Sequence, residues 1–224
     1  TLSGIGLKMG SGLTALAGGS LLLLLIFTMF SSILLGMGVP TTANYLITST
    51  IMAPVVARAL MTSLPEVYGA LQAINPALAI LPAHLFTFYF GIIADITPPV
   101  ALAAMAGAAI AKSNPLRTGV EATRLAIAAF LVPYIFVYSP QMLMLNAHWY
   151  EVALIALTAV IGMFGIGMAV EKYWDSKLNL LQQLMALAGG LLLIIPGLVT
   201  DAVGFTLIAL VVIWQRVQKK KAAA

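Results

Sequence analysis

The sequence predicts an all-α integral membrane protein. Of its residues, 62% are hydrophobic and 8% are charged, whereas a soluble domain carries about 25% charged residues. Such a chain cannot cover itself with a water-compatible surface, and in lipid only helices and closed barrels pair all their backbone groups. The apolar stretches are too long and too continuous for the alternating strands of a barrel. Helices are therefore expected.

Composition also excludes several functions. The chain has no Cys, and its two His residues are far apart in sequence, so we expect no metal centre of these residues and no cofactor. The net charge is +4, but the basic residues lie in short loops and near the C-terminus, as in membrane proteins. We therefore expect no nucleic-acid binding. No nucleotide-binding or protease motif is present, and we expect no enzyme activity.

The segment 1–19 is rich in Gly and only moderately apolar, and it is expected to be a connector or the tail of an upstream helix. The first residue is not Met, and no signal-peptide pattern precedes the first apolar segment. We therefore expect the chain to begin inside a longer protein.

Residues 20–60 are predicted to form a re-entrant helical hairpin. Its apolar arms, 20–35 and 43–60, would each be about 24–27 Å long, slightly short for a bilayer core of about 30 Å. Two short arms around a polar turn fit a hairpin better than two full spans. The residues of this turn, which we call the tip, are Gly36, Met37, Gly38, Val39, Pro40, Thr41 and Thr42.

A second interruption follows. Residues 61–81 are expected to be a surface loop with a short amphipathic helix, and 82–113 a discontinuous transmembrane helix. The interruption, which we call the break, contains Asp95, Thr97, Pro98 and Pro99. Paired prolines remove two backbone donors, and a broken helix at membrane depth is tolerated only where protein or a watery cavity covers it.

Residues 114–145 are predicted to be a transmembrane helix and 146–224 to be additional C-terminal transmembrane helices. Basic residues cluster at 112–124, 172–177 and 216–221. If these clusters are cytoplasmic, two crossings are needed between 180 and 214. Two short spans are therefore favoured there over one bent helix.

Both interruptions suggest chemistry. Asp95 is the only carboxylate near the middle of a long apolar stretch, so we expect it to bind a cation or carry a proton. The alternative is that Asp95 or Thr97 caps the following half-helix by bonding its free N–H groups. The tip and the nearby Asn44 offer oxygen atoms that suit a hard cation, or half-helix N-termini that suit an anion. Taken alone, the tip is better interpreted as an ordinary tight turn. A pair of broken elements, however, is typical of a transporter binding site.

Three motifs carry a family resemblance. GMGVPTT (36–42), ITPPVALAA (96–104) and SNPLRTGVEA (113–122) occur in this order. Over about residues 1–145 the chain resembles the large membrane subunit of tripartite ATP-independent periplasmic (TRAP) transporters, and specifically the C-terminal portion of the form in which small and large subunits are fused. The remainder is similar to the extra C-terminal helices of that form.

The resemblance implies an elevator-type, cation-coupled importer of organic acids in the cytoplasmic membrane of a bacterium or archaeon. This chain would supply the second of two inverted repeats. Its partners would be a periplasmic substrate-binding protein, the first repeat, the small-subunit helices and membrane lipid. By position, the implied substrate and cation site contains Gly36, Gly38, Pro40, Thr41, Thr42, Asn44, Asp95, Thr97, Pro98 and Pro99.

The coupling ion stays open between Na⁺ and H⁺. Sodium would be held by Thr41, Thr42, Asp95 and Thr97, but many separate large subunits have an acidic residue where this chain has Val39 and Pro40. A non-transporting interaction or assembly subunit, or an incomplete fragment, is the alternative. A second hairpin and a second Pro-broken helix encoded upstream would favour the permease.

Overall fold

The computed structural model describes residues 5–195 and 197–223, and its regular elements there are all helical. This confirms the all-α class. The chain folds as two compact units, 1–123 and 124–224, and each is described by itself.

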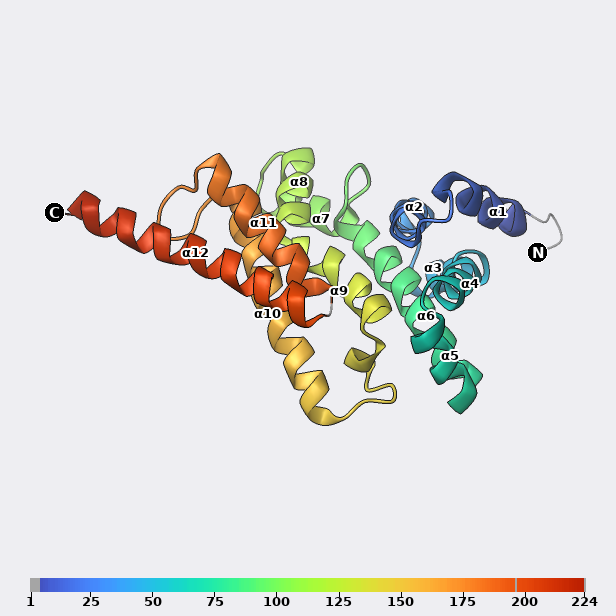
Figure 1. Cartoon of the computed structure of the whole chain (residues 1–224). Coiled ribbons are helices and arrows are strands. Elements are labelled where there is room, and N and C mark those ends of the chain that lie inside the picture. Colours follow the sequence, from blue (N-terminus) through green and yellow to red (C-terminus); the bar gives the residue numbers. More distant parts are fainter. Residues whose placement is uncertain (1–4, 196, 224) are drawn as a thin grey trace. The chain divides into compact units, whose positions relative to one another are not determined.

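In the first unit, a central helix gathers the others around it. Helix α6 packs against α2, α3, α4 and α5, and Figure 1 shows these helices around it. The elements of this unit are α1 (Ile5–Ala17), α2 (Leu21–Gly36), α3 (Thr41–Ile51), α4 (Ala53–Ser63), α5 (Pro65–Ile74), α6 (Pro76–Ile93), η1 (Ala94–Ile96), α7 (Leu102–Ile110) and the start of α8 (Pro115–Leu125).

The second arm of the hairpin is not one straight helix as expected. It consists of α3 and α4, which meet at Met52 with a bend of 47°. Pro54 lies in the first turn of α4 and cannot donate to the carbonyl of Thr50. The Thr50 hydroxyl donates back to the Leu46 carbonyl at 2.9 Å, and back-bonding of this kind bends helices.

Residues 61–81 contain more helix than the expected surface loop with a short amphipathic helix. Helix α4 continues to Ser63, α5 fills most of the segment, and α6 begins at Pro76 rather than at residue 82. Pro65 and Pro76 each start a helix at a position where no backbone donor is needed. Tyr68 of α5 is fully buried. Residues 1–19 likewise contain the helix α1.

The second unit is built on three tightly packed helices. Its elements are α9 (Ile127–Tyr138), η2 (Pro140–Leu143), α10 (Trp149–Glu171), α11 (Leu180–Ile194) and α12 (Leu198–Ala223). The segment 114–145, expected as one helix, thus contains α8, α9 and η2. A separation at Ala126 divides α8 from α9.

Helices α11 and α12 form a helical hairpin rather than one bent helix. Near its open end, the amide of Gln215 donates to Gln182 at 2.8 Å, and both side chains are fully buried. Nearer the turn, a Cβ on Gly204 would lie 2.8 Å from the carbonyl oxygen of Gly189. Small residues that admit close backbone approach are the usual means of packing helices in lipid.

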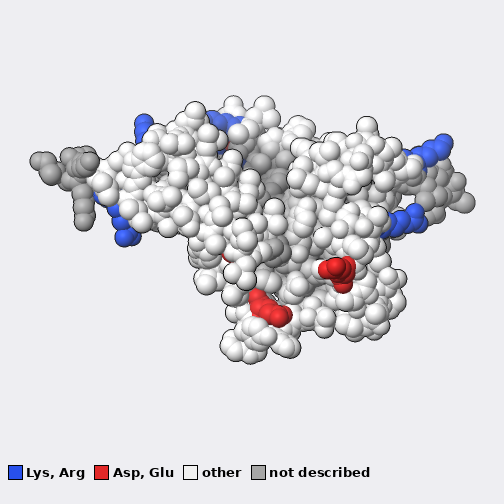
Figure 2. Space-filling view, in the orientation of Figure 1, with Lys and Arg blue, Asp and Glu red and all other residues white. Residues whose placement is uncertain are grey.

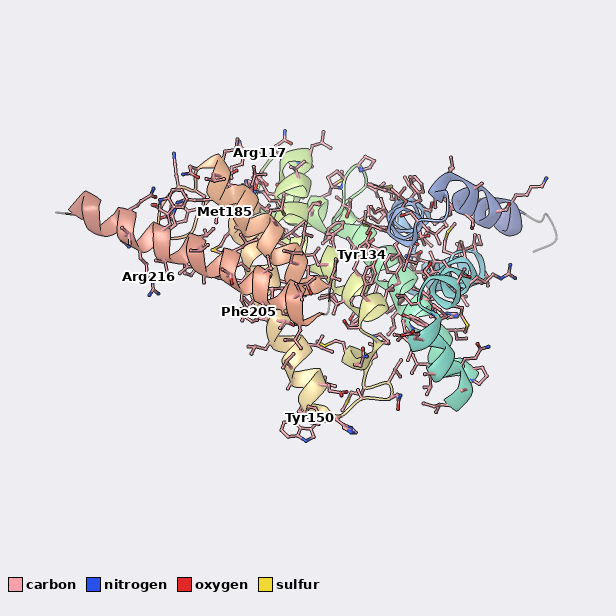
Figure 3. The ribbon with its side chains drawn as sticks, in the orientation of Figure 1. Arg117, Tyr134, Tyr150, Met185, Phe205 and Arg216 are labelled. Atoms are coloured by element: carbon pink, nitrogen blue, oxygen red, sulfur yellow. The ribbon has the colours of Figure 1, made fainter. Side chains whose placement is uncertain are left out.

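The surface and the helix lengths suit lipid. Three described helical segments are long and apolar enough to span a membrane, namely Pro76–Ile96, Trp149–Glu171 and Leu198–Lys219, and the total rises to five if the bent pairs α3–α4 and α8–α9 each count as one span. Figure 2 shows few charged side chains on a mostly uncharged surface. In the second unit, Tyr150 marks one end of α10 and Arg216 projects outward from α12 (Figure 3).

Substituting Gly190→Ala is expected to destabilise the second unit. The added Cβ would lie 2.6 Å from the carbonyl oxygen of Gly162 and 2.6 Å from Ile166, so α10 and α11 must move apart. Overpacking of this kind costs about 1–3 kcal/mol. Thermal unfolding of the detergent-solubilised chain, followed by circular dichroism, measures the loss.

Gly167→Ala in α10 is the matched control, because its Cβ meets nothing within 4 Å. It should melt at or above the wild-type temperature, since Ala favours helix. Equal melting of Gly190→Ala and the wild type would contradict the close contact.

Candidate functional site

The tip is a tight turn that depends on glycine. The backbone N–H of Val39 donates to the carbonyl of Gly36 at 3.3 Å, and Met37 and Gly38 lie between them. Met37 has φ −63° and ψ 117°, and Gly38 has φ +73°. These angles define a type II turn, whose third residue needs positive φ and therefore favours Gly. The turn ends at Pro40, which precedes α3.

Asn44 connects the hairpin to α6. Its side chain fills a notch between Gly36 at the end of α2 and Gly91 in α6. A Cβ on Gly91 would lie 2.2 Å from Asn44 Nδ2, and one on Gly36 would lie 2.8 Å from the same atom. Asn44 is 2% exposed. The absence of side chains at both glycines thus makes room for this carboxamide.

The break after α6 is a short 3₁₀ turn, η1, followed by a second turn at residues 98–100. The Thr97 hydroxyl donates to the Ile93 carbonyl at 2.7 Å. Thr97 itself is extended, and α7 starts only after Ala101. Neither Asp95 nor Thr97 caps α7, because Ala101 holds the cap position and no side chain bonds there. The capping alternative for these two residues is therefore wrong.

Two other elements of the first unit cover the break. On one side, a Cβ on Gly36 would lie 3.1 Å from Ala94 Cβ, so the start of the tip touches η1. On the other side, Thr123 of α8 donates to the Ile96 carbonyl at 3.0 Å. Gly119, one turn before Thr123, leaves room for Pro98. The break is thus held between the tip and α8.

Several buried oxygen atoms of α2 and α3 have no hydrogen-bond partner among the described residues. They include Asn44 Oδ1 and the hydroxyls of Thr28 and Ser32, which are all buried. Thr28, Ser32 and Gly36 are spaced four apart, so they share one face of α2. Buried polar oxygens are costly when unpaired. This face of α2 is therefore a candidate for holding a ligand.

The predicted site residues divide into two groups. Gly36 and Asn44 lie directly against α6 and η1, whereas Thr41 and Thr42 are exposed in the first turn of α3. In the described chain, no hydrogen bond joins Thr41 or Thr42 to the break. Asp95 is partly exposed, and its carboxylate makes no hydrogen bond or ion pair with a described residue. Gly38, Pro40 and Pro99 are also exposed, and Pro98 is partly buried.

The donor set suits a hard cation. No group of three or more His, Asp or Glu side chains is found among the described residues. The junction instead offers an amide oxygen, hydroxyls and one carboxylate. Hard cations prefer oxygen ligands of this kind, whereas transition metals prefer nitrogen and sulfur.

Three contacts at the junction were not anticipated from the sequence. Tyr45 Oη and His84 Nδ1 are 3.1 Å apart, and the Tyr45 ring also packs edge-on against Phe88. The other two contacts are the approach of Asn44 to Gly91 and the hydrogen bond from Thr123 to the Ile96 carbonyl. The signals were faint: an aromatic residue directly after Asn44, and small residues at helical spacing. Only the packing of α3 and α8 reveals their partners.

Together, the fold and the site define a multi-pass α-helical membrane protein in which a hairpin tip meets a broken helix. A scan against protein-family models matches "Tripartite ATP-independent periplasmic transporter, DctM component" over residues 1–150. The chain belongs to this family of transporter membrane components. A search of curated proteins and a search of solved structures found no match.

Substituting Gly91→Ala is expected to displace Asn44 and to loosen the hairpin from α6. The new Cβ would occupy the position of the carboxamide, and we expect a loss of about 1–3 kcal/mol in unfolding free energy. In an Asn44→Ala background the same change should cost less, because the clash is gone. Denaturant unfolding of the four proteins measures this coupling.

Gly107→Ala in α7 is the control, since its Cβ meets nothing within 4 Å. Strictly additive effects of Gly91→Ala and Asn44→Ala would show that the two residues do not touch.

Proposed function

We propose that the chain is a permease component of a secondary active, cation-coupled importer of organic acids. The importer would depend on a periplasmic substrate-binding protein and work by an elevator motion in the cytoplasmic membrane of a bacterium or archaeon. Membership of the DctM component family supports the permease role. The observation that best supports this proposal is the contact of Gly36 with Ala94, which joins the tip to the break.

Coupling follows from what a cation would do at this junction. The Asp95 carboxylate lies in the interruption that follows α6, and Asn44 Oδ1 is buried without a described partner. A bound cation offsets the desolvation cost of both groups, so it favours the arrangement in which the hairpin lies against α6. The hydroxyls of Thr41, Thr42 and Thr97 would supply further oxygen ligands.

Substrate binding would then depend on the cation. The hairpin positions the first turn of α3, whose free backbone N–H groups attract a carboxylate. If the cation orders the hairpin, it pre-organises these donors, and the acid binds more tightly. By thermodynamic linkage, the acid in turn tightens binding of the cation.

Asp95→Ala is expected to raise the cation concentration for half-maximal uptake by about 10- to 100-fold, because hydrogen bonds and contacts to a charged group contribute about 1.5–3 kcal/mol. Thr41→Ala should raise it by about fivefold. The measurement is uptake of a labelled organic acid into vesicles that contain the complete permease and its binding protein. Na⁺ is varied at fixed pH, and pH at fixed Na⁺.

Glu66→Ala in α5 and Thr206→Ala in α12 are matched controls for charge and hydroxyl, because neither lies at the junction. Cation dependence that is unchanged in both Asp95→Ala and Thr41→Ala would refute the coupling site. If uptake requires the chain but is unaffected by the substitutions at Asp95 and Thr41, the result would support an assembly role instead.

A further inference from the structure

A long groove accompanies the hairpin in the first unit. Its volume is about 1480 Å³, and it lies between α1 and the start of α2 on one side and α3 and α4 on the other. The two-helix arm contributes residues at steps of four, which therefore form one face. They are Leu46, Thr50, Pro54, Arg58 and Thr62. The groove thus follows the arm over most of its length.

The hydroxyls along this groove are largely engaged by their own helices. Ser11 donates to the Lys8 carbonyl at 3.0 Å, and Thr14 donates to the Gly10 carbonyl at 2.9 Å. Thr62 does the same toward the Arg58 carbonyl at 2.9 Å. Their hydrogen atoms are consequently not offered to a ligand. With Leu24, Ile47 and other aliphatic side chains, the walls are mainly apolar.

Two cations line the groove, and no acidic residue does. Lys8 and Arg58 are exposed, and neither side chain makes an ion pair or hydrogen bond with a described residue. Helices α1 and α4 touch where Gly10 meets Val55, at 2.6 Å for a Cβ built on Gly10. Lys8 lies two residues from Gly10, about 3 Å along the axis of α1. Arg58 lies three residues from Val55, about 4.5 Å along the axis of α4. Both side chains line this one groove.

We propose that this groove binds an anionic phospholipid. The phosphate contacts Lys8 and Arg58, and an acyl chain lies along the arm beside Leu46 and Ile47. Arg and Lys between membrane helices recognise lipid head groups, and the guanidinium fork matches phosphate geometry.

The size of the groove favours a lipid over a small anion. Pockets for small molecules measure about 300–1,000 Å³ and enclose their ligand. This groove is larger and mainly apolar, so a small organic acid would leave most of its wall in contact with water. An acyl chain covers that wall at little cost, because it exchanges a lipid environment for one that is equally apolar. The inference is independent of the proposed transport function.

The experiment measures lipid retention by the full chain. The protein is purified from mixed micelles of phosphatidylglycerol and phosphatidylcholine with identical acyl chains, and bound lipid is quantified by native mass spectrometry. Lys8→Gln and Arg58→Gln should each reduce the preference for phosphatidylglycerol about fivefold, and the double variant about 25-fold, because each cation contributes about 1 kcal/mol.

Two further variants separate charge from shape. Arg216→Gln removes a cation from α12, outside the groove, and should leave the preference unchanged. Ile47→Trp places a bulky ring in the groove while both cations stay, and it should reduce retention of both lipids.

Three results would overturn the proposal. The first is equal retention of the two lipids by the wild type. The second is an identical loss in Arg216→Gln and in the groove variants. The third is displacement of phosphatidylglycerol by inorganic phosphate or by a dicarboxylate at equal concentration, which would make the groove a small-anion site.

Discussion

The first unit depends on the insertion of one carboxamide between two helices that lack side chains at the point of contact. Asn44 occupies the notch formed by Gly36 and Gly91, and it thereby brings the tip against η1. In lipid, an interrupted helix must be covered because its free backbone groups have no water to bond. The close approach at these glycines supplies that cover on one side, and Thr123 supplies it on the other.

The two units solve the problem of packing in lipid by different means. In the second unit, glycines such as Gly162 and Gly190 bring backbones together, and the buried glutamines Gln182 and Gln215 pair with each other. In the second unit, Ser139 Oγ and Asp201 Oδ1 are the buried side-chain atoms without a described hydrogen-bond partner. The first unit also uses glycines, but the polar group that they admit keeps an oxygen without a described partner. The unpaired Asn44 oxygen lies where the hairpin meets α6, which agrees with the cation site proposed there.

The sequence was sufficient for the class of fold because hydropathy and proline positions act locally. Low charge predicted lipid as the solvent, and the glycines and prolines at 36–42 and 94–99 predicted where helices end. The bend at Met52 and the packing of α5 were missed. Pro54 and Pro65 were visible, but a proline near a helix start and one in a loop give the same local signal. Which applies depends on the burial of residues such as Tyr68.

The site was harder to predict because its members meet only through tertiary packing. Asp95 and Thr97 stand out in an apolar stretch, whereas Gly91 looks like an ordinary glycine until Asn44 lies against it. The structure also ranks the predicted residues. Gly36 and Asn44 join the tip to α6, while Thr41 and Thr42 lie in the exposed first turn of α3. A cation held by both groups would require that turn to approach Asp95. Approach of the first turn of α3 to Asp95 is therefore the physical step that cation binding would have to favour.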